Sequence, residues 1–181
     1  MNKRLNIFKG IRLIGLLLML SHFSSFSNLM AAKVHKQFTI EQIKDTLPVL
    51  NKEILTFVDT HLHHKVGSGE CWDLAAIPLN NLHAKWDRQY VFGKLLRPAK
   101  DSVLPGDIIQ FDGVVVSTTK GNSHITMYLT QHTAIIYKVL ENLHFVLAQQ
   151  NTSDYGRTVS MGEIDLSHLE KGRFMIYRPV D

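Results

Sequence analysis

The second half of the chain, from Leu104 onward, restricts the fold most strongly, because strand-like runs follow one another there with turn residues between them. The turn sequences KGN (120–122) and ENL (141–143) each separate two such runs, which is typical of a β-hairpin. Strands joined by turns this short run antiparallel. We therefore expect an antiparallel sheet built from the segments PGDIIQF, GVVVSTT, HITMYLT, HTAIIYKVL, HFVLAQQN and GRFMIYRPV.

The first half of the chain favours helices. Residues 38–65 have helical periodicity, and Thr39 and Gln42 are spaced as in a capping box at its start. Pro48 is expected to divide this segment into two pieces. The second piece places its apolar residues on one helical face, namely Leu50, Ile54, Phe57, Val58 and Leu62.

Two glycines, Gly67 and Gly69, are expected to end that helix. A second helix is predicted over 71–82, with Pro78 kinking or shortening it, and 83–101 is expected to be a connector. A chain of 181 residues is long enough for one domain with a substantial core. Helices followed by strands predict an α+β fold.

The N-terminal segment, residues 1–32, has the order of a secretory signal peptide: positive charge, a short apolar run and small polar residues. Its apolar run, Leu13 to Leu20, is well short of the roughly 20 residues that span a bilayer. We therefore predict an exported protein, periplasmic or extracellular, with no stable membrane anchor after cleavage. Cleavage fits equally well after any of three residues, Ser27, Ala31 or Ala32.

Removal of this segment would leave a helical extension at 33–66 and a catalytic domain at 67–181. It would also remove the excess positive charge. The chain has 20 basic and 16 acidic residues, and the segment contains four of the basic residues and none of the acidic ones, so 16 of each remain. We therefore expect no nucleic-acid partner, because no excess of basic residues remains to bind phosphates.

Cys71 is the only cysteine of the chain and lies in the sequence GSGECWDLA. A lone cysteine in an oxidising compartment is a buried inert thiol, an intermolecular link or a reactive nucleophile. A thiol attacks as thiolate, which the N-terminus of a helix favours. Gly67 and Gly69 permit the sharp turn that would present Cys71 there, next to backbone N–H groups able to stabilise an oxyanion.

A nucleophilic thiol also needs a histidine within hydrogen-bond reach, and His132 begins the predicted strand HTAIIY. Gln149 and Asn151 lie in the neighbouring predicted strand, where they share one face because strand side chains alternate. An amide oxygen on that face would accept the ring N–H and fix the tautomer of His132. The pattern leaves open which of the two amides does so.

The motifs GSGECWDLA, LPGDIIQF, HTAII and FVLAQQN, in this order, resemble the papain-like cysteine amidase superfamily of CHAP and NlpC type. The resemblance covers roughly residues 67–151. It implies a papain-like fold in which the nucleophile starts a helix packed on an antiparallel sheet. It further implies Cys71 as nucleophile, His132 as general base, and Gln149 or Asn151 as the residue that orients the histidine.

Members of this superfamily mostly cleave amide bonds in peptidoglycan. The resemblance therefore implies an exported cysteine hydrolase of peptidoglycan, an amidase or endopeptidase that needs no cofactor. Two alternatives stay open: a secreted toxin or effector that acts on another amide, and an inactive binding module of the same fold. The chain departs from the family pattern at Glu70, where many relatives have Gln, and in QQN, which lacks a carboxylate.

The histidine cluster HLHH and two aspartates have structural interpretations. The histidines of HLHH (61–64) have no companion cysteine or carboxylate cluster, so we interpret them as a solvated helix end and predict no metal site. Asp73 and Asp107 are interpreted as structural residues, at a helix start and in a turn.

Overall fold

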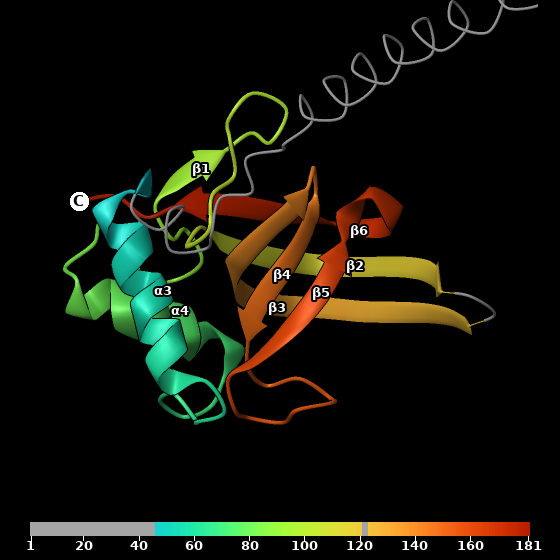
Figure 1. The fold of residues 1–181 in the computed structure, drawn as a ribbon, viewed down its shortest axis with the longest axis horizontal. Helices are drawn as coiled ribbons and strands as arrows, with labels where there is room; N and C mark the ends of the chain where they lie inside the picture. Colours follow the sequence, from blue (N-terminus) through green and yellow to red (C-terminus); the bar gives the residue numbers. More distant parts are fainter. Residues whose placement is uncertain (1–45, 121–122) are drawn as a thin grey trace, which may run out of the picture. The chain divides into compact units, whose positions relative to one another are not determined.

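The computed structural model describes residues 46–120 and 123–181, all of which belong to one compact unit. Two α-helices and six strands are described, with a short 3₁₀ turn before the last strand (Figure 1). Their bounds are α3 Val49–His61, α4 Cys71–Asn81, β1 Lys94–Leu96, β2 Ile108–Lys120, β3 Ser123–Glu141, β4 His144–Gln149, β5 Ser160–Asp165, η2 Leu166–His168 and β6 Leu169–Arg178. The predicted α+β class is confirmed.

The strands form one antiparallel sheet in the order β1-β6-β2-β3-β4-β5. Four of the predicted segments merge into two long strands, because PGDIIQF continues into GVVVSTT as β2, and HITMYLT continues into HTAIIYKVL as β3. In this hairpin Phe111 stands opposite His132. β1 and β5 were not predicted.

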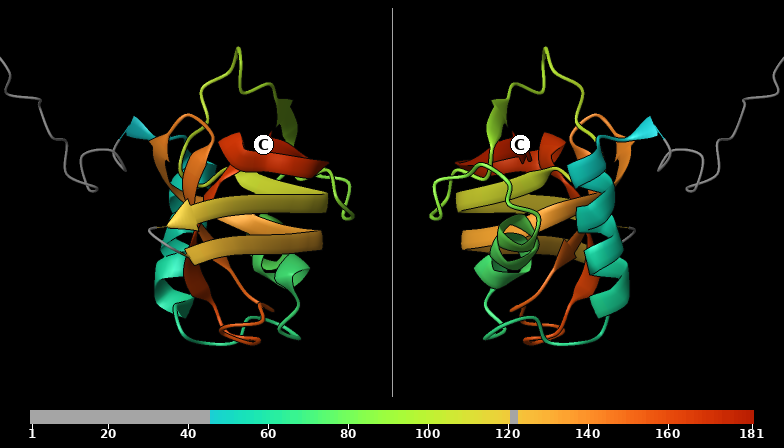
Figure 2. Two further views of the ribbon diagram at one scale, coloured as in Figure 1. Left: turned by 90° about the vertical axis from the view of Figure 1, so that its right-hand side faces the viewer. Right: turned by 90° about the vertical axis from the view of Figure 1, so that its left-hand side faces the viewer.

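Both helices cover the same face of the sheet, as the right-hand view of Figure 2 shows. Ile54 and Val58 of α3 pack with Leu74 of α4 against Ile135 of β3 and Ala148 of β4. Full burial of each such aliphatic side chain contributes about 1.5–3 kcal/mol. Since α3 shares this core with α4 and the sheet, the described part of the predicted extension packs as one body with the predicted catalytic domain.

The opposite face of the sheet has a core of its own. Ile109 and Phe111 of β2 pack there with Ala134 and Ile136 of β3 and with Leu147 of β4. These residues alternate with those that face the helices, as the period of two in a strand requires. The side of the sheet on which a residue of β3 lies can therefore be read from the core it joins.

α3 ends earlier than we predicted. The predicted end at residue 65 is wrong, because the helix stops at His61 and the next residue, Leu62, has a non-helical ψ of 132°. Leu62 forms an isolated bridge with Val159, and the N–H of His63 donates to the carbonyl of Val159 at 2.9 Å. Pairing with this distant segment overrides the helical pattern. The predicted capping box of Thr39 lies outside the described residues.

Pro78 does not interrupt α4, which runs from Cys71 to Asn81 with this proline inside it. The proline ring lacks an N–H and removes one intrahelical hydrogen bond. It is buried in this structure, and the helix closes with a bond of 3.0 Å from the N–H of Leu82 to the carbonyl of Pro78. Neither helix within 46–120 and 123–181 has the length and apolar content that a bilayer span requires.

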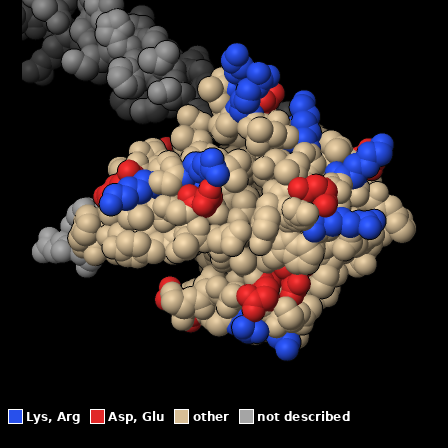
Figure 3. Space-filling view, turned by 180° about the vertical axis from the view of Figure 1, so that it is seen from behind, with Lys and Arg blue, Asp and Glu red and all other residues tan. Residues whose placement is uncertain are grey.

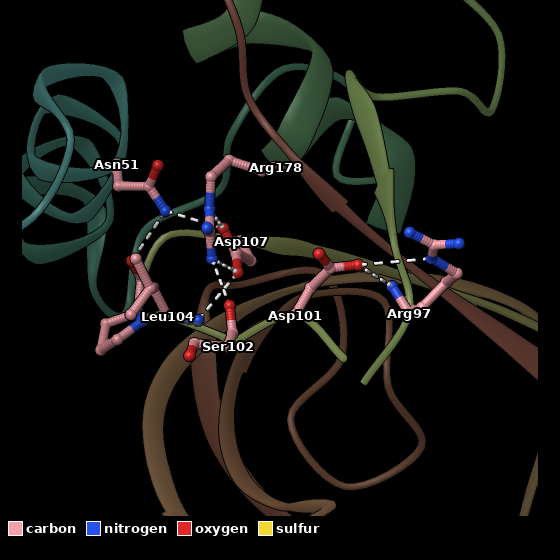
Figure 4. Close-up of polar contacts among 8 residues, drawn as sticks. Asn51, Arg97, Asp101, Ser102, Leu104, Asp107 and Arg178 are labelled. Atoms are coloured by element: carbon pink, nitrogen blue, oxygen red, sulfur yellow. Dashed lines mark hydrogen bonds and ion pairs between the residues drawn. The ribbon is translucent and has the colours of Figure 1, made fainter. Parts of the chain in front are cut away.

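A fully buried carboxylate, Asp107, joins three parts of the fold (Figure 4). Its Oδ1 accepts hydrogen bonds from Nδ2 of Asn51 at 2.9 Å and Nε of Arg178 at 3.0 Å. Its Oδ2 accepts from the N–H of Leu104 and from Nη2 of Arg178, both at 2.8 Å. The same Nη2 donates to the carbonyl of Ser102 at 2.7 Å. Asp107 thus fixes α3, the start of β2 and the end of β6 to one another.

We expect Arg178→Met to lower the free energy of unfolding by about 3–5 kcal/mol, because it leaves the carboxylate of Asp107 buried without its cation. The measurement is urea denaturation followed by circular dichroism. Arg173→Met is the matched control on the same strand, since Arg173 pairs with Asp112 at an exposed site. The free energy of unfolding of Arg173→Met should fall by less than about 1 kcal/mol. Equal losses in the two variants would contradict the role of Asp107.

Candidate active site

The turn before Cys71 is held in place by the first turn of α4. Gly67 and Gly69 have φ of 59° and 92°, a region that glycine adopts readily. The carboxylate Oδ2 of Asp73 accepts hydrogen bonds from the N–H of Ser68 at 2.7 Å and from its hydroxyl at 2.6 Å. Asp73 therefore fixes the turn, and Cys71 is the first residue of the helix and partly exposed.

Gln150, which is fully buried just after β4, ties this turn to the sheet. Its Oε1 accepts from the N–H of Val66 at 3.1 Å, and its Nε2 donates to the carbonyl of Val66 at 3.0 Å. The same Nε2 donates to the carbonyl of Glu70 at 2.7 Å. Because the Glu70 carbonyl belongs to the peptide bond before Cys71, Gln150 places the thiol at the end of β4.

The side chain of Glu70 is engaged by two partners. Its Oε1 pairs with Nη2 of Arg157 at 2.8 Å, and its Oε2 accepts from Nδ2 of Asn151 at 2.7 Å. A free carboxylate beside a thiol opposes thiolate formation. Here the guanidinium of Arg157 offsets the negative charge, so the departure at Glu70 does not leave an uncompensated anion beside Cys71.

His132 is buried and contacts Gln149. Its Nε2–H donates to Oε1 of Gln149 at 2.9 Å, which leaves Nδ1 as the bare nitrogen of the neutral ring. Burial lowers the pKa of His132 below its ordinary value of 6.5, and the hydrogen bond to Gln149 partly opposes this effect. His132 is therefore neutral at pH 7, which is the form that a general base requires.

The ring of His132 lies on the face of the sheet that α4 does not cover. It stacks against Phe111 with ring centroids 6.3 Å apart, and Phe111 belongs to the core of that face. Ile135, three residues along β3, belongs instead to the core beneath the helices. Across the described residues, no hydrogen bond joins Sγ of Cys71 to the ring of His132. The imidazole and the thiol thus approach the end of β4 from opposite sides.

A cleft of about 660 Å³ opens beside His132, and Gln149 and Asn151 also line it. Figure 3 shows the molecule hollowed below the hairpin that ends in the grey tip. On the rest of this face, positive and negative side chains are interspersed. The cleft is large enough for a small ligand or a short peptide segment.

The structure divides the predicted site residues into two groups. Gln149 contacts His132, whereas Asn151 contacts Glu70 of the nucleophile turn. Sequence reasoning missed Gln150, whose position between the two candidate amides was the available signal. It also missed Gly162, where an added Cβ would overlap Nε2 of Gln149. Nothing in the local sequence identifies Gly162, because β4 and β5 come together only in the folded sheet.

The sequence profile of the AIM3/BBC1 cysteine proteinase-fold domain matches residues 31–181. The chain belongs to this family. A cysteine proteinase-like fold is thereby shown, in agreement with the helices packed on an antiparallel sheet.

The chain is 26% identical over 165 residues to altered inheritance of mitochondria protein 3 of the yeast Debaryomyces hansenii. The alignment covers 78% of this chain and 17% of that protein, so the chain spans about a sixth of the length of this relative. A solved structure titled the crystal structure of Ly7917 superposes with a TM-score of 0.43 and 16% identity, covering 72% of this chain and 62% of that one.

The similarity to the yeast protein corrects one prediction. We predicted export, but this relative is named for the inheritance of mitochondria, a process inside cells. The predicted periplasmic or extracellular localisation is therefore wrong. That prediction came from the charged and apolar order of residues 1–32, which lie outside the described residues.

We predict that Gly162→Ala displaces the amide of Gln149, because the overlapping atom Nε2 is at the end of a flexible side chain and moves more easily than the backbone. Without the hydrogen bond that opposes its lowering, the pKa of His132 should fall further. An NMR titration of the ring Cε1–H measures this pKa. In a Gln149→Ala background the same substitution should leave the pKa unchanged, and a further fall there would rule out this cause.

We also predict a loss of stability in acid that depends on His132. Its pKa is lower in the folded chain than in the unfolded chain, so its contribution is complete above pH 6.5 and is lost as pH falls through the lowered folded pKa. The urea midpoint of the wild type should therefore fall more between pH 7 and pH 5 than that of His132→Gln. His64→Gln, at an exposed position, is the control and should follow the wild type.

Proposed function

We propose that this chain is a cysteine hydrolase of amide bonds, with Cys71 as nucleophile, His132 as general base and Gln149 as the residue that orients it. One observation carries the proposal: three consecutive residues hold both halves of the site. Gln149 bonds the imidazole, while Gln150 and Asn151 bond the turn that presents the thiol. This arrangement also supports a CHAP- or NlpC-type site within the cysteine proteinase fold.

The chemistry follows from the free atoms of these residues. Nδ1 of His132 takes the thiol proton, and Sγ of Cys71 attacks the carbonyl carbon of the substrate. The N–H of Asp73 donates to the carbonyl of Glu70 at 3.1 Å, whereas those of Cys71 and Trp72 precede the first intrahelical hydrogen bonds of α4 and can stabilise the resulting oxyanion. The carbon–nitrogen bond breaks as the imidazolium protonates the leaving amine, and a water molecule then hydrolyses the thioester.

The proton transfer requires the ring and the thiol to meet at the end of β4. β4 ends at Gln149, and it pairs with β3 only from Ile135 onward. Past Gln149 no strand of the sheet lies between the face that carries His132 and the face that carries α4. Catalytic hydrogen bonds are often long in the free enzyme and tighten when substrate binds. We propose that substrate in the cleft draws Nδ1 of His132 and Sγ of Cys71 together in this way.

We propose a peptide amide as the substrate class. A cleft lined by strand residues suits an extended peptide. The specific prediction of peptidoglycan has no support from the similarity to the yeast protein, whose name concerns mitochondria. The predicted toxin or effector role depended on secretion and falls with it.

A second candidate function is a binding module that retains the fold without catalysis. The observation that favours it is the separation of Cys71 from the ring of His132 described above. In that case the cleft would bind a peptide segment, and the thiol would react no faster than a free cysteine.

A reactivity assay tests the catalytic proposal. We expect a peptidyl vinyl sulfone to form an adduct on Cys71, detected by mass spectrometry of tryptic peptides, and a library of fluorogenic peptide amides to contain a substrate. Cys71→Ala should abolish both signals. His132→Gln should lower the rate of cleavage about 100-fold or more, the usual contribution of a general base.

The matched control is His168→Gln in η2, because His168 pairs with Asp165 and neither residue lines the cleft. It should keep the wild-type rate. Purified peptidoglycan, assayed in parallel, should release no product. Labelling of Cys71 at the rate of glutathione, with no amide cleaved, would reject catalysis and support the binding module.

A further inference from the structure

The half of β3 that precedes His132 has an open edge. β2 pairs with β3 over Ser123–Ile135, whereas β4 pairs with it only over Ile135–Glu141. Within the described part of the chain, Ile125–Gln131 therefore has a strand on one side and none on the other. The N–H and C=O groups of a strand alternate between its two sides, so the open side carries donors and acceptors in the spacing of a β-ladder.

The cleft runs along this edge. All residues from Ile125 to His132 line it, without a gap. Consecutive strand residues point to opposite faces, so a cleft that all of them line must meet the strand at its edge. The opposite wall is formed by Asn151–Asp154 and by Gly162–Ile164 of β5. The cleft therefore occupies the position that a further strand paired with β3 would take.

The charges in the cleft indicate the chemistry of an occupant. Asp154 and Glu163 line it, Oε1 of Glu163 lies 2.8 Å from Nε2 of His144, and no Lys or Arg lines the cleft among the residues that the structure describes. Two large side chains on the open edge, Ile125 and Tyr128, are 45% and 74% exposed. An occupant with positive side chains and with apolar residues between them would match both features.

We propose that the open edge of β3 binds an extended, positively charged peptide segment as an added β-strand, with backbone hydrogen bonds to Ile125–Gln131 and with basic side chains near Asp154 and Glu163. The strand would lead toward His132 at one end of the edge, and in this the inference rests on the proposed function. It names the substrate of the same site, and binding itself does not require Cys71.

Hydrogen exchange on the full chain tests the inference. The probe is a ten-residue peptide of alternating Lys and Val, added to the Cys71→Ala variant so that no turnover occurs. We expect amide protection confined to 125–131 and the facing wall. A peptide of alternating Glu and Val, and a Lys-Val peptide with every residue N-methylated, should bind at least tenfold more weakly, because they lack the positive charge and the backbone donors, respectively.

Two substitutions separate edge binding from general attraction. Tyr128→Lys adds a positive charge on the edge and should weaken binding of the Lys-Val peptide about tenfold. Tyr90→Lys adds the same charge at an exposed position outside the cleft and should leave the affinity unchanged. Equal effects of the two substitutions on the affinity for the Lys-Val peptide would overturn the inference. Amide protection outside the cleft would overturn it as well.

The outcomes also distinguish this inference from the proposed function. If the Lys-Val peptide protects the edge but wild-type protein does not cleave any peptide, the inference holds and the proposed hydrolase fails. If peptides are cleaved without protection of 125–131, the hydrolase holds and strand addition fails. Protection of the edge that rises with protein concentration and needs no peptide would show pairing with a second copy and would overturn the inference.

Discussion

The buried carboxylate of Asp107 is the constraint on which the rest of the structure depends. Asn51 of α3 and Arg178 of β6 both donate hydrogen bonds to this carboxylate, just before β2 begins. With the start of β2 fixed, the register of the hairpin sets Phe111 opposite His132. Asp107 thereby fixes the start of the strand that pairs with the His132 strand, and its own carbonyl accepts from the N–H of Ile136 at 2.8 Å. Loss of its cation would leave a buried charge, which makes this site costly to change.

The end of β4 then joins the parts of the candidate site. Because side chains alternate, Gln149 reaches His132 on one face while Gln150 reaches the nucleophile turn on the other. Termination of the strand also leaves the edge of β3 open along the cleft. One strand end therefore orients the imidazole, positions the thiol and provides room for an extended ligand, which links the proposed chemistry to the proposed mode of binding.

Local patterns in the sequence predicted α4, the two hairpin turns and the α+β class, since each depends on neighbouring residues. β5 could not be predicted, because SMGEID lacks strict alternation and is ordered by pairing with β4. The end of α3 likewise depends on Val159, about a hundred residues away. Alternation placed Gln149 within reach of His132, but it could not show that the ring packs on Phe111, away from α4, because cross-strand packing decides that.

The most direct test of the central claim is the rate at which a peptidyl vinyl sulfone, whose peptide part can occupy the cleft, alkylates Cys71 at pH 6, compared between wild type and His132→Gln. If the imidazole and the thiol act as one unit when a peptide occupies the cleft, the wild-type rate should exceed that of the variant at least tenfold. The difference should vanish in 6 M urea, because only the folded chain has the cleft in which the peptide draws the two groups together. Equal rates in the folded proteins would contradict the account.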